Sequence, residues 1–175
     1  MIIGITGKKG AGKDTIGDAL RELGYERVSF ATPLKEVAKI VFGITDEEMT
    51  DRTLKETEID RYPFKSPRKI LQILGTDMFR TFFDGCWVEC FKRNNSDGKN
   101  VFITDVRFLD EAEAIKELGG KMVRIVRPAL NDDGDRHPSE MEMEKIECDF
   151  VIENEEGEVG ISNARKKLLD IVQRL

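Results

Sequence analysis

The sequence lacks several features that mark other classes of protein. No apolar run approaches the length of a membrane span, so we expect no transmembrane helix. The 28 basic residues are outnumbered by 34 acidic ones, and a formal charge of −6 argues against a protein that coats nucleic acid. The first residues resemble a core strand more than a cleavable signal. Internal repeats and low-complexity tracts are also missing from the sequence.

Cysteine is scarce, and there is a single histidine. The three cysteines, Cys86, Cys90 and Cys148, form no C-x-x-C pair. Cys86 and Cys90 are four residues apart on an expected helix and could share a metal ion, but no histidine lies near them in the sequence. Buried, reduced thiols are the favoured alternative. They predict a cytoplasmic location.

A glycine-rich turn stands between an apolar run and a helical pattern near the start of the chain. The run at 1–6 is long enough for one buried strand, and the segment from Gly7 to Thr15 follows it directly. Apolar residues then recur at helical spacing until Gly24. In such a turn the backbone N–H groups face an anion, the helix N-terminus adds partial positive charge, and Lys13 adds a full one. The pattern predicts a phosphate-binding loop.

This loop departs from the usual pattern at one position. In G-x-x-x-x-G-K-[ST] the last hydroxyl ligates Mg²⁺, whereas here Asp14 stands there and the hydroxyl follows at Thr15. The alternative is a turn that binds nothing, in which these two residues cap the helix. The flanking strand and helix favour a nucleotide-binding site.

The rest of the chain alternates strand and helix patterns. Further strands are expected at 25–30, 101–104, 122–126 and 149–153, with helices between them and a closing helix at 161–175. A capping box at Thr45 predicts a helix as far as about Ile59. Another helix crosses Gly75, where a glycine weakens the helix and implies a local reason. The alternation predicts one α/β domain, 1–175, with a mostly parallel five-stranded sheet flanked by helices on both faces.

Charged side chains follow the strand expected at 101–104. Asp105 and Arg107 lie just past its carboxyl end, at the sheet edge that also carries the phosphate loop, and Glu111 follows one helical turn later. A mutual ion pair or a helix cap is the alternative role for the first two. Five cations, however, surround one expected pocket, as transfer between two phosphorylated molecules requires. They are Lys9, Lys13, Arg68, Arg107 and Arg127.

A series of motifs along the chain matches a known family in order. They are G-x-x-x-x-G-K-D-T at Gly7 to Thr15, Ala31-x-Pro33-Leu34-Lys35, Arg68-x-x-x-Gln72-x-Leu74-Gly75-Thr76-Asp77, Trp87-Val88, Thr104-Asp105-x-Arg107-x-x-x-Glu111, Val126-Arg127-Pro128, His137-Pro138-Ser139-Glu140 and Asp149-x-Val151-Ile152. With them the chain resembles the deoxynucleoside monophosphate kinases best known from bacteriophages, in the P-loop nucleoside monophosphate kinase group. In that family an aspartate after the loop lysine is the norm. The resemblance implies the three-layer P-loop NTPase fold.

The resemblance also implies an activity and residue roles. The activity is ATP-dependent phosphorylation of (deoxy)nucleoside monophosphates to diphosphates, with Mg²⁺. The ATP phosphates would be held by Gly10, Ala11, Gly12, Lys13, Asp14 and Thr15, and the metal by Asp14 and Thr15. The acceptor would be bound by Lys9, Arg68, Gly75, Thr76, Trp87, Asp105, Arg107 and Glu111. The expected catalytic residues are Lys13, Arg107 and Arg127. The partner is therefore a small nucleotide, with no nucleic acid polymer and no membrane, and a homodimer follows by analogy alone.

Two segments are given roles in this interpretation. A helical region at about 33–95 is expected to bind the acceptor, and the polar stretch at about 127–140 to form a lid, the alternative being a solvated connection. His137 is interpreted as a lid or loop-anchoring residue, because an acceptor phosphate is already an anion and needs no imidazole base. The chain is short between Phe42 and Ser66 beside larger family members, which leaves base selectivity open.

Other functions remain as alternatives. A dephospho-coenzyme A or phosphomevalonate kinase would share the loop and the sheet, but is not expected to show Leu-Gly-Thr-Asp followed by Trp-Val. A nucleotide switch or scaffold is a different class. A GTPase switch would need an N-K-x-D motif, which the sequence lacks, and a protein that only binds a nucleotide would leave Arg68 and Arg107 without a purpose.

Overall fold

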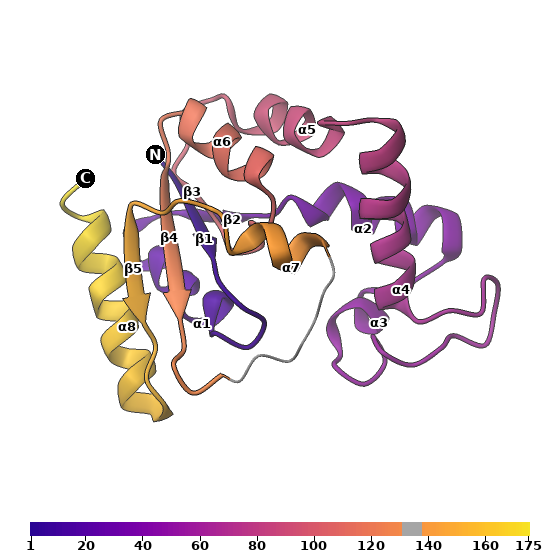
Figure 1. The fold of residues 1–175 in the computed structure, drawn as a ribbon, viewed down its shortest axis with the longest axis horizontal. Helices are drawn as coiled ribbons and strands as arrows, with labels where there is room; N and C mark the ends of the chain where they lie inside the picture. The colour runs from indigo at the N-terminus through magenta and orange to yellow at the C-terminus, as the bar shows by residue number, and fades with distance from the viewer. Residues whose placement is uncertain (131–137) are drawn as a thin grey trace. The chain divides into compact units, whose positions relative to one another are not determined.

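The computed structural model describes residues 1–130 and 138–175. Two compact units make up this part of the chain (Figure 1). The first unit is formed by Met1–Ser29 and Phe91–Leu175, and the second by Phe30–Cys90. Each unit has its own buried side chains and is described by itself.

A five-stranded sheet forms the centre of the first unit. Its strands are β1 (Ile2–Thr6), β2 (Glu26–Val28), β3 (Val101–Ile103), β4 (Lys121–Val126) and β5 (Phe150–Glu153), in the order β2-β3-β1-β4-β5. Every pair of neighbours is parallel. All five residues of β1 are buried, as a strand covered on both faces requires. The predicted five-stranded sheet is confirmed.

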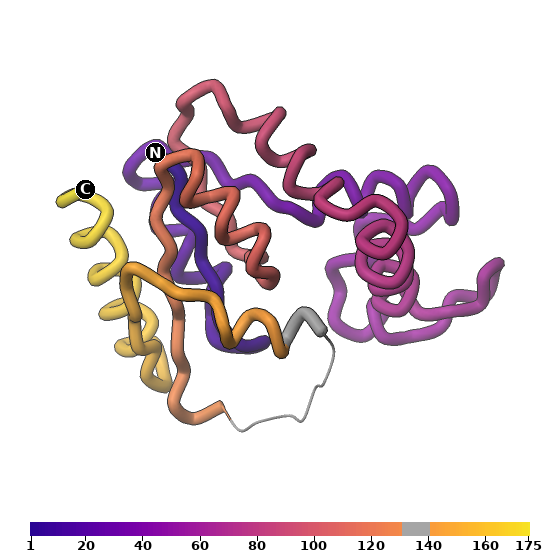
Figure 2. The backbone as a smooth tube through the Cα atoms, turned by 45° about the horizontal axis from the view of Figure 1, so that its top comes forward, coloured from indigo at the N-terminus to yellow at the C-terminus, as the bar shows by residue number. Residues whose placement is uncertain are grey.

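Helices cover both faces of this sheet. Ile3 and Ile5 of β1 pack into one core with Ile16, Leu20 and Leu168, which belong to α1 (Lys13–Gly17), the 3₁₀ helix η1 (Asp18–Leu23) and α8 (Gly157–Val172). Figures 1 and 2 both show α8 beside β5. Strands β1, β3, β4 and β5 therefore share one apolar core with the helices on this face.

The opposite face of the sheet carries α6 (Leu109–Glu117). Gly4 explains how closely this helix approaches, because a Cβ at Gly4 would lie 2.8 Å from Cδ1 of Ile115 and 2.4 Å from Sδ of Met122. The unit also contains the second half of α5 (Cys86–Asn95), and all of α7 (Pro138–Met143). The sheet thus lies between two helical layers, and the predicted three-layer α/β fold is confirmed.

The second unit is helical. It consists of α2 (Ala31–Phe42), α3 (Asp46–Thr50), α4 (Pro67–Gln72) and the π-helix η2 (Ile73–Arg80), together with the first half of α5. A small core forms from Ala38, Ile44, Met49, Ile59, Ile70 and Leu74. Gly75 lies buried in the π-helix, where a Cβ would be 2.8 Å from Cδ2 of Leu34. Close packing of α2 on η2 is thus the local reason for the glycine.

Two expectations about helix limits were wrong. The capping box at Thr45 is present, with Glu48 N donating to Thr45 Oγ1 at 3.2 Å and Thr45 N to Glu48 Oε2 at 2.8 Å, but α3 ends at Thr50, well before Ile59. Asp51 ends it, because its Oδ1 accepts from the N–H groups of Thr53 and Leu54, both at 2.8 Å. The loop expected as far as 140 already gives way to α7 at 138, while 131–137 lie outside the described residues.

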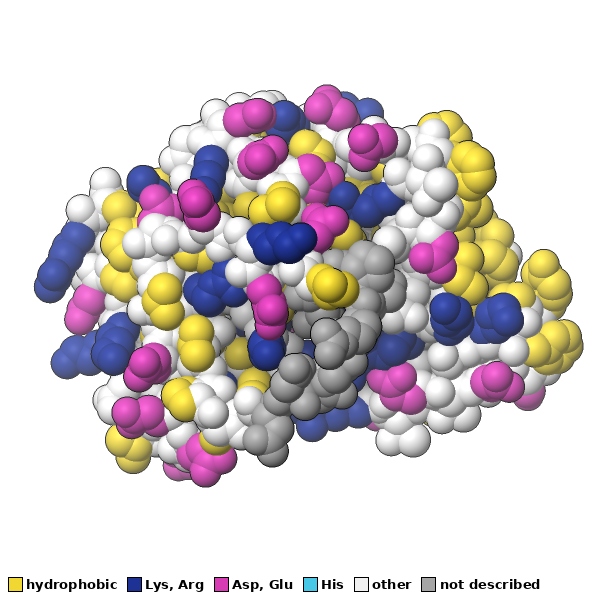
Figure 3. Space-filling model, viewed as in Figure 1, with side chains coloured by type: hydrophobic (Ala, Val, Ile, Leu, Met, Phe, Trp, Pro, Cys, Tyr) yellow, Lys and Arg dark blue, Asp and Glu magenta, His cyan; other side chains and the backbone are white. Residues whose placement is uncertain are grey.

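The surface is mixed in character. On the face in Figure 3, basic and acidic side chains are interspersed, with no segregation into a stripe of one sign. Exposed hydrophobic side chains are more frequent in the second unit and include Ile40, Val41, Tyr62, Phe64, Phe82 and Phe83. Within residues 1–130 and 138–175, no helix has the length and apolar character needed to cross a membrane.

An ion pair ties the segment after α3 back to that helix. Arg61 Nη1 donates to Glu48 Oε1 at 2.9 Å, and Arg61 Nη2 to Oε2 at 2.7 Å. Arg61 Nη2 also donates to the carbonyl of Gly43 at 2.9 Å. The hydrogen bonds from Arg61, and then the one from the backbone of Thr45, lower the pKa of Glu48 from 4.5 to about 2.

We predict that Glu48→Gln lowers the free energy of unfolding by about 1–2 kcal/mol at neutral pH, since charged hydrogen bonds are replaced by weaker neutral ones. A depressed carboxylate pKa stabilises the fold above the unfolded pKa, and this contribution is lost as the pH falls from about 4.5 toward about 2. Urea unfolding of the variant and the wild type should therefore converge at acidic pH. Glu36→Gln, in an exposed pair with Lys39, is the control. If the difference in unfolding free energy between Glu48→Gln and the wild type stays constant from neutral to acidic pH, the lowered pKa of Glu48 is contradicted.

Candidate active site

The segment between β1 and α1 adopts a backbone that only glycine accepts without strain. Gly7, Gly10 and Gly12 have φ angles of +143°, +82° and +90°. A Cβ at Gly7 would lie 2.2 Å from the carbonyl oxygen of Ile125 in β4. The glycines predicted from the motif are therefore required both by the loop's conformation and by its contact with the sheet.

Lys13 begins α1 and folds back over this loop. Its Nζ donates to the carbonyl oxygens of Gly7 at 2.5 Å and Lys8 at 2.9 Å. The ammonium group is thus held against the backbone of the loop. This is the arrangement that places a cation beside a bound phosphate.

Asn154 bonds to the phosphate loop, a contact that the sequence did not predict. It follows β5 directly and is only 1% exposed. Its Nδ2 donates to the carbonyl oxygen of Ala11 at 2.8 Å. Its backbone N–H donates to the carbonyl oxygen of Val126 at 2.7 Å. A Cβ at Gly12 would come within 2.6 Å of the same Nδ2. The available signal was a polar residue at the carboxyl end of the last strand, the edge where ligands bind.

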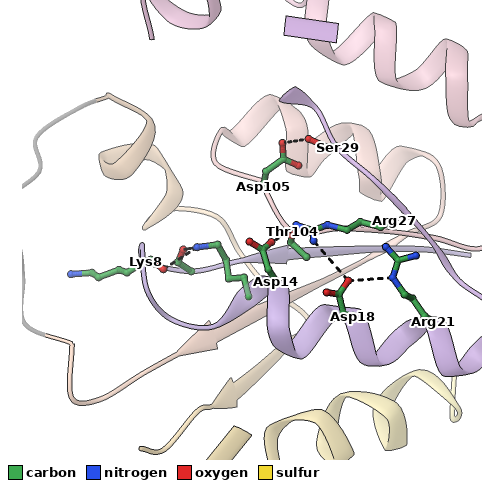
Figure 4. A network of polar contacts seen from close by, with 10 residues as sticks. Lys8, Asp14, Asp18, Arg21, Arg27, Ser29, Thr104 and Asp105 are labelled. Carbon is green, nitrogen blue, oxygen red and sulfur yellow. Dashed lines mark hydrogen bonds and ion pairs between the residues drawn. The ribbon is translucent and has the colours of Figure 1, made fainter. Parts of the chain in front are cut away.

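Asp14 is engaged by two side chains from elsewhere in the sheet (Figure 4). Its Oδ1 accepts a hydrogen bond from Thr104 Oγ1 at 2.5 Å and another from Arg27 Nη2. Thr104 is buried just past β3, and Arg27 lies in β2. Arg27 was not predicted, since a charged residue in a short edge strand gives no functional signal.

Asp14 and Thr15 are both exposed at the start of α1. A carboxylate and a hydroxyl are the hard oxygen ligands that Mg²⁺ prefers, so these residues fit the predicted metal. The described residues contain no group of three or more histidine, cysteine, aspartate or glutamate side chains arranged to hold a metal ion.

The residues after β3 form a second polar group. Asp105 Oδ2 accepts a hydrogen bond from Ser29 Oγ at 2.6 Å, a partner that was not predicted (Figure 4). Glu111 is 4% exposed, and its Oε2 accepts from the N–H groups of Arg107 at 2.8 Å and Phe108 at 3.2 Å. Glu111 therefore caps α6 and fixes the backbone that carries Arg107. Its contact with an acceptor stays a prediction.

Two further predicted cations lie on loops of the first unit. Lys9 is exposed within the phosphate loop. Arg127 follows β4 and is half-buried, and its carbonyl accepts from Leu130 N at 3.0 Å. Leu130 Cδ2 would lie 3.4 Å from a Cβ at Gly10, so the chain after β4 passes against the phosphate loop. His137 and most of the predicted lid fall outside the described residues.

The other four predicted residues belong to the second unit. Arg68 Nε donates to Glu56 Oε1 at 2.5 Å. Trp87 Nε1 donates to the carbonyl of Gly75 at 3.0 Å, and its ring centroid lies 5.0 Å from that of Phe79. Thr76 is half-buried in η2. Arg68 and Trp87 thus have defined structural partners, and the binding roles of all four stay predictions.

Comparison with known proteins decides the family. A sequence profile for deoxynucleotide monophosphate kinase matches residues 63–162. A protein of Acanthamoeba polyphaga mimivirus, provisionally named deoxynucleotide monophosphate kinase, is 38% identical over 172 residues, covering 88% of each chain. The deoxynucleoside-5'-monophosphate kinase of Escherichia phage T5 is 24% identical over 180 residues, covering 67% of this chain and 72% of the phage protein. This chain belongs to the deoxynucleotide monophosphate kinase family.

Membership in the deoxynucleotide monophosphate kinase family confirms the predicted phosphotransferase class. Among solved structures, dephospho-CoA kinase from Campylobacter jejuni superposes with a TM-score of 0.55 at 14% identity, covering 99% of this chain and 97% of that one. At this identity the likeness supports the fold alone. The dephospho-coenzyme A kinase alternative is therefore supported only by a shared fold, while the relatives in sequence are named as nucleotide kinases.

For this member of the deoxynucleotide monophosphate kinase family, we predict that Gly12→Ala weakens ATP binding at least about tenfold and lowers the melting temperature. The added Cβ would meet Asn154 Nδ2 at 2.6 Å, in a backbone conformation with φ of +90°. Calorimetric titration and thermal unfolding would measure the two effects. Gly24→Ala is the matched control, because its φ is +79° but nothing lies within 4 Å of the new Cβ. Equal ATP affinities for the two variants would contradict the role of the Gly12–Asn154 contact.

Proposed function

We propose that the protein transfers the γ-phosphoryl group of ATP to the phosphate of a nucleoside monophosphate, preferentially a deoxynucleotide. Family membership and one structural observation support this function. The phosphate loop, with Lys13 and Asp14, stands at the same sheet edge as the Thr104–Asp105–Arg107 segment. A donor site and an acceptor site side by side are what a nucleotide kinase needs.

The loop residues 10–15 would bind the phosphates of ATP. On binding, Lys13 exchanges the carbonyls of Gly7 and Lys8, which it now contacts, for phosphate oxygens. Asp14 and Thr15 would hold Mg²⁺, which, when bound, neutralises the charge of the donor phosphates. The fixed N–H groups of the loop then need no rearrangement during the reaction.

The nucleoside monophosphate would be bound by two kinds of side chain, a cation and a carboxylate that accepts hydrogen bonds. Arg107 suits the monophosphate, since a guanidinium pairs with two phosphate oxygens at once. Asp105, held by Ser29, suits a hydroxyl or amino group of the nucleoside, because a carboxylate repels a phosphate. The acceptor-binding roles that the family resemblance implies for Arg68, Gly75, Thr76 and Trp87 of the second unit stay predictions.

The transfer step follows from the charges of the reactants. An oxygen of the acceptor monophosphate forms a bond to the γ-phosphorus, and the bond from that phosphorus to the bridging oxygen breaks, which leaves ADP and a nucleoside diphosphate. No base is required, because the attacking oxygen is already anionic. We assign Lys13, Arg107 and Arg127 to stabilise the charge on the transferring group. A cytoplasmic location, a homodimer and a lid at 127–140 stay predictions.

Lys13→Ala should lower kcat by about a hundredfold to a thousandfold in a protein that remains folded, since it removes a positioned cation from the transferring phosphates. Coupled detection of ADP in the presence of a monophosphate acceptor measures the effect. Lys166→Ala, on an exposed face of α8, should retain wild-type turnover. Near-normal kcat in the Lys13 variant would remove the basis for the donor site.

Arg107→Ala should raise the KM for the monophosphate about tenfold or more while the affinity for ATP changes less than about twofold. The reason is the position of Arg107 past β3, on a backbone fixed by Glu111. Separate titrations of ATP and acceptor test this, with Arg174→Ala near the C-terminus as control. A loss confined to ATP would assign Arg107 to the donor.

A further inference from the structure

Arg27 connects three parts of the first unit at the phosphate loop. From the edge strand β2, its Nη2 donates to Asp14 Oδ1 and to Thr104 Oγ1, the latter at 2.8 Å. Its Nη1 lies 3.8 Å from Asp18 Oδ1. Figure 4 shows the guanidinium between the start of α1 and the end of β3. The Arg27 side chain is 33% exposed, so the group is partly shielded from water.

The hydrogen bonds around Asp14 form a closed triangle. Thr104 Oγ1 donates to Asp14 Oδ1 and accepts from Arg27, which also donates to the same Oδ1. Both bonds to the carboxylate therefore end on one oxygen. Among the described residues no side chain donates to Oδ2, so the second oxygen stays available on the exposed side.

A carboxylate at position 14 creates an electrostatic problem that a serine or threonine does not. ATP carries several negative charges, and a further negative charge at the start of α1 repels it. Asp18, one turn later, adds a further negative charge, although its Oδ1 also pairs with Arg21 Nε at 3.3 Å. Arg27 is the cation in contact with Asp14 within the described part of the chain.

We propose that Arg27 is a positioning residue of the donor site, which offsets the charge of Asp14 and holds its carboxylate against Thr104 by one oxygen. This inference rests on the proposed function, since it assumes that the loop binds ATP. It explains how the loop tolerates an aspartate after the lysine. The aspartate therefore depends on the arginine, whereas a neutral residue at position 14 would not.

The alternative role of Arg27 is purely structural. β2 has three residues and pairs only with β3 in the described sheet, so Arg27 also fastens an edge strand to α1. The two roles differ in one respect. If Arg27 only fastens the strand, Asp14→Asn should itself weaken ATP binding through the lost ion pair, or Arg27→Met should cost the same in both backgrounds through Thr104. Charge compensation predicts instead that Asp14→Asn keeps its ATP affinity and removes most of the need for Arg27.

The test is a double-mutant cycle on ATP affinity, measured by calorimetric titration in EDTA at low ionic strength. Omitting Mg²⁺ removes any contribution of Asp14 as a metal ligand. Arg27→Met should weaken ATP binding about tenfold, and the loss should shrink as salt is added. Asp14→Asn should bind ATP as tightly as the wild type or more so. Arg27→Met in the Asp14→Asn background should lie within about threefold of Asp14→Asn alone.

Two further variants keep the cycle interpretable. Arg21→Met is the matched control, because Arg21 pairs with Asp18 and not with Asp14 in the described contacts, and its ATP affinity should change less than about twofold. Arg27→Lys keeps the charge and should retain ATP affinity within about threefold even if Arg27→Met fails to fold.

Several outcomes would overturn the proposal. If Arg27→Met weakens ATP binding equally in the wild-type and Asp14→Asn backgrounds, only the structural role is left. If Arg27→Met leaves the ATP affinity of the wild-type protein unchanged, Arg27 has no role in ATP binding. With a poorly folded Arg27→Met, Asp14→Asn binding ATP more weakly than the wild type in EDTA would also overturn it. If the wild-type protein fails to bind ATP, the proposed function itself is contradicted. If it binds ATP but the effects of Arg27→Met and Asp14→Asn on ATP affinity are independent, only the role of Arg27 is contradicted.

Discussion

The candidate site depends on how the backbone after β1 is fixed against the carboxyl ends of the neighbouring strands. Gly7 lies so close to Ile125 of β4 that a side chain there would meet the carbonyl at 2.2 Å. Asn154, after β5, donates to the carbonyl of Ala11 in the same loop. A carbonyl that is bonded to a buried donor has a fixed orientation, which fixes the peptide groups beside it. The sheet therefore imposes the loop's shape before any ligand arrives.

The charged groups around this loop already have hydrogen-bond partners within the protein. Lys13 is held by the loop's own carbonyls, Asp14 by Arg27 and Thr104, and Asp105 by Ser29. Under the proposed function, phosphate oxygens replace the carbonyl oxygens that Lys13 now contacts. Such an exchange costs less than desolvating isolated charges, because each group is already paired and oriented. The acidic protein can thus bind an anion at one edge of its sheet.

The fold was largely predictable from the sequence, because strand and helix periods and glycine positions are local signals. Gly75 is an example, since the helical pattern implied a reason for it and the structure shows Leu34 packed against it. The end of α3 was missed because Asp51 bonds the backbone two and three residues ahead, which competes with the helix without altering the apolar pattern.

The residues that support the site were harder to predict, because their contacts join distant segments. Ser29 and Asp105 are 76 residues apart in the sequence, and Asn154 and Ala11 are 143 apart. No spacing rule connects such pairs until the strand order is known. Glu111 was predicted as an acceptor ligand, and its capping of α6 emerged only from the folded backbone.

The central claim is that the protein phosphorylates a nucleoside monophosphate. The most direct measurement is an acceptor panel, in which ATP and Mg²⁺ are offered with each deoxy- and ribonucleoside monophosphate, dephospho-coenzyme A and phosphomevalonate, and the phosphorylated product is identified. We expect nucleoside diphosphates from one or more deoxynucleoside monophosphates, at rates that far exceed ATP hydrolysis without an acceptor. Product from dephospho-coenzyme A or phosphomevalonate, with none from any nucleoside monophosphate, would contradict the account.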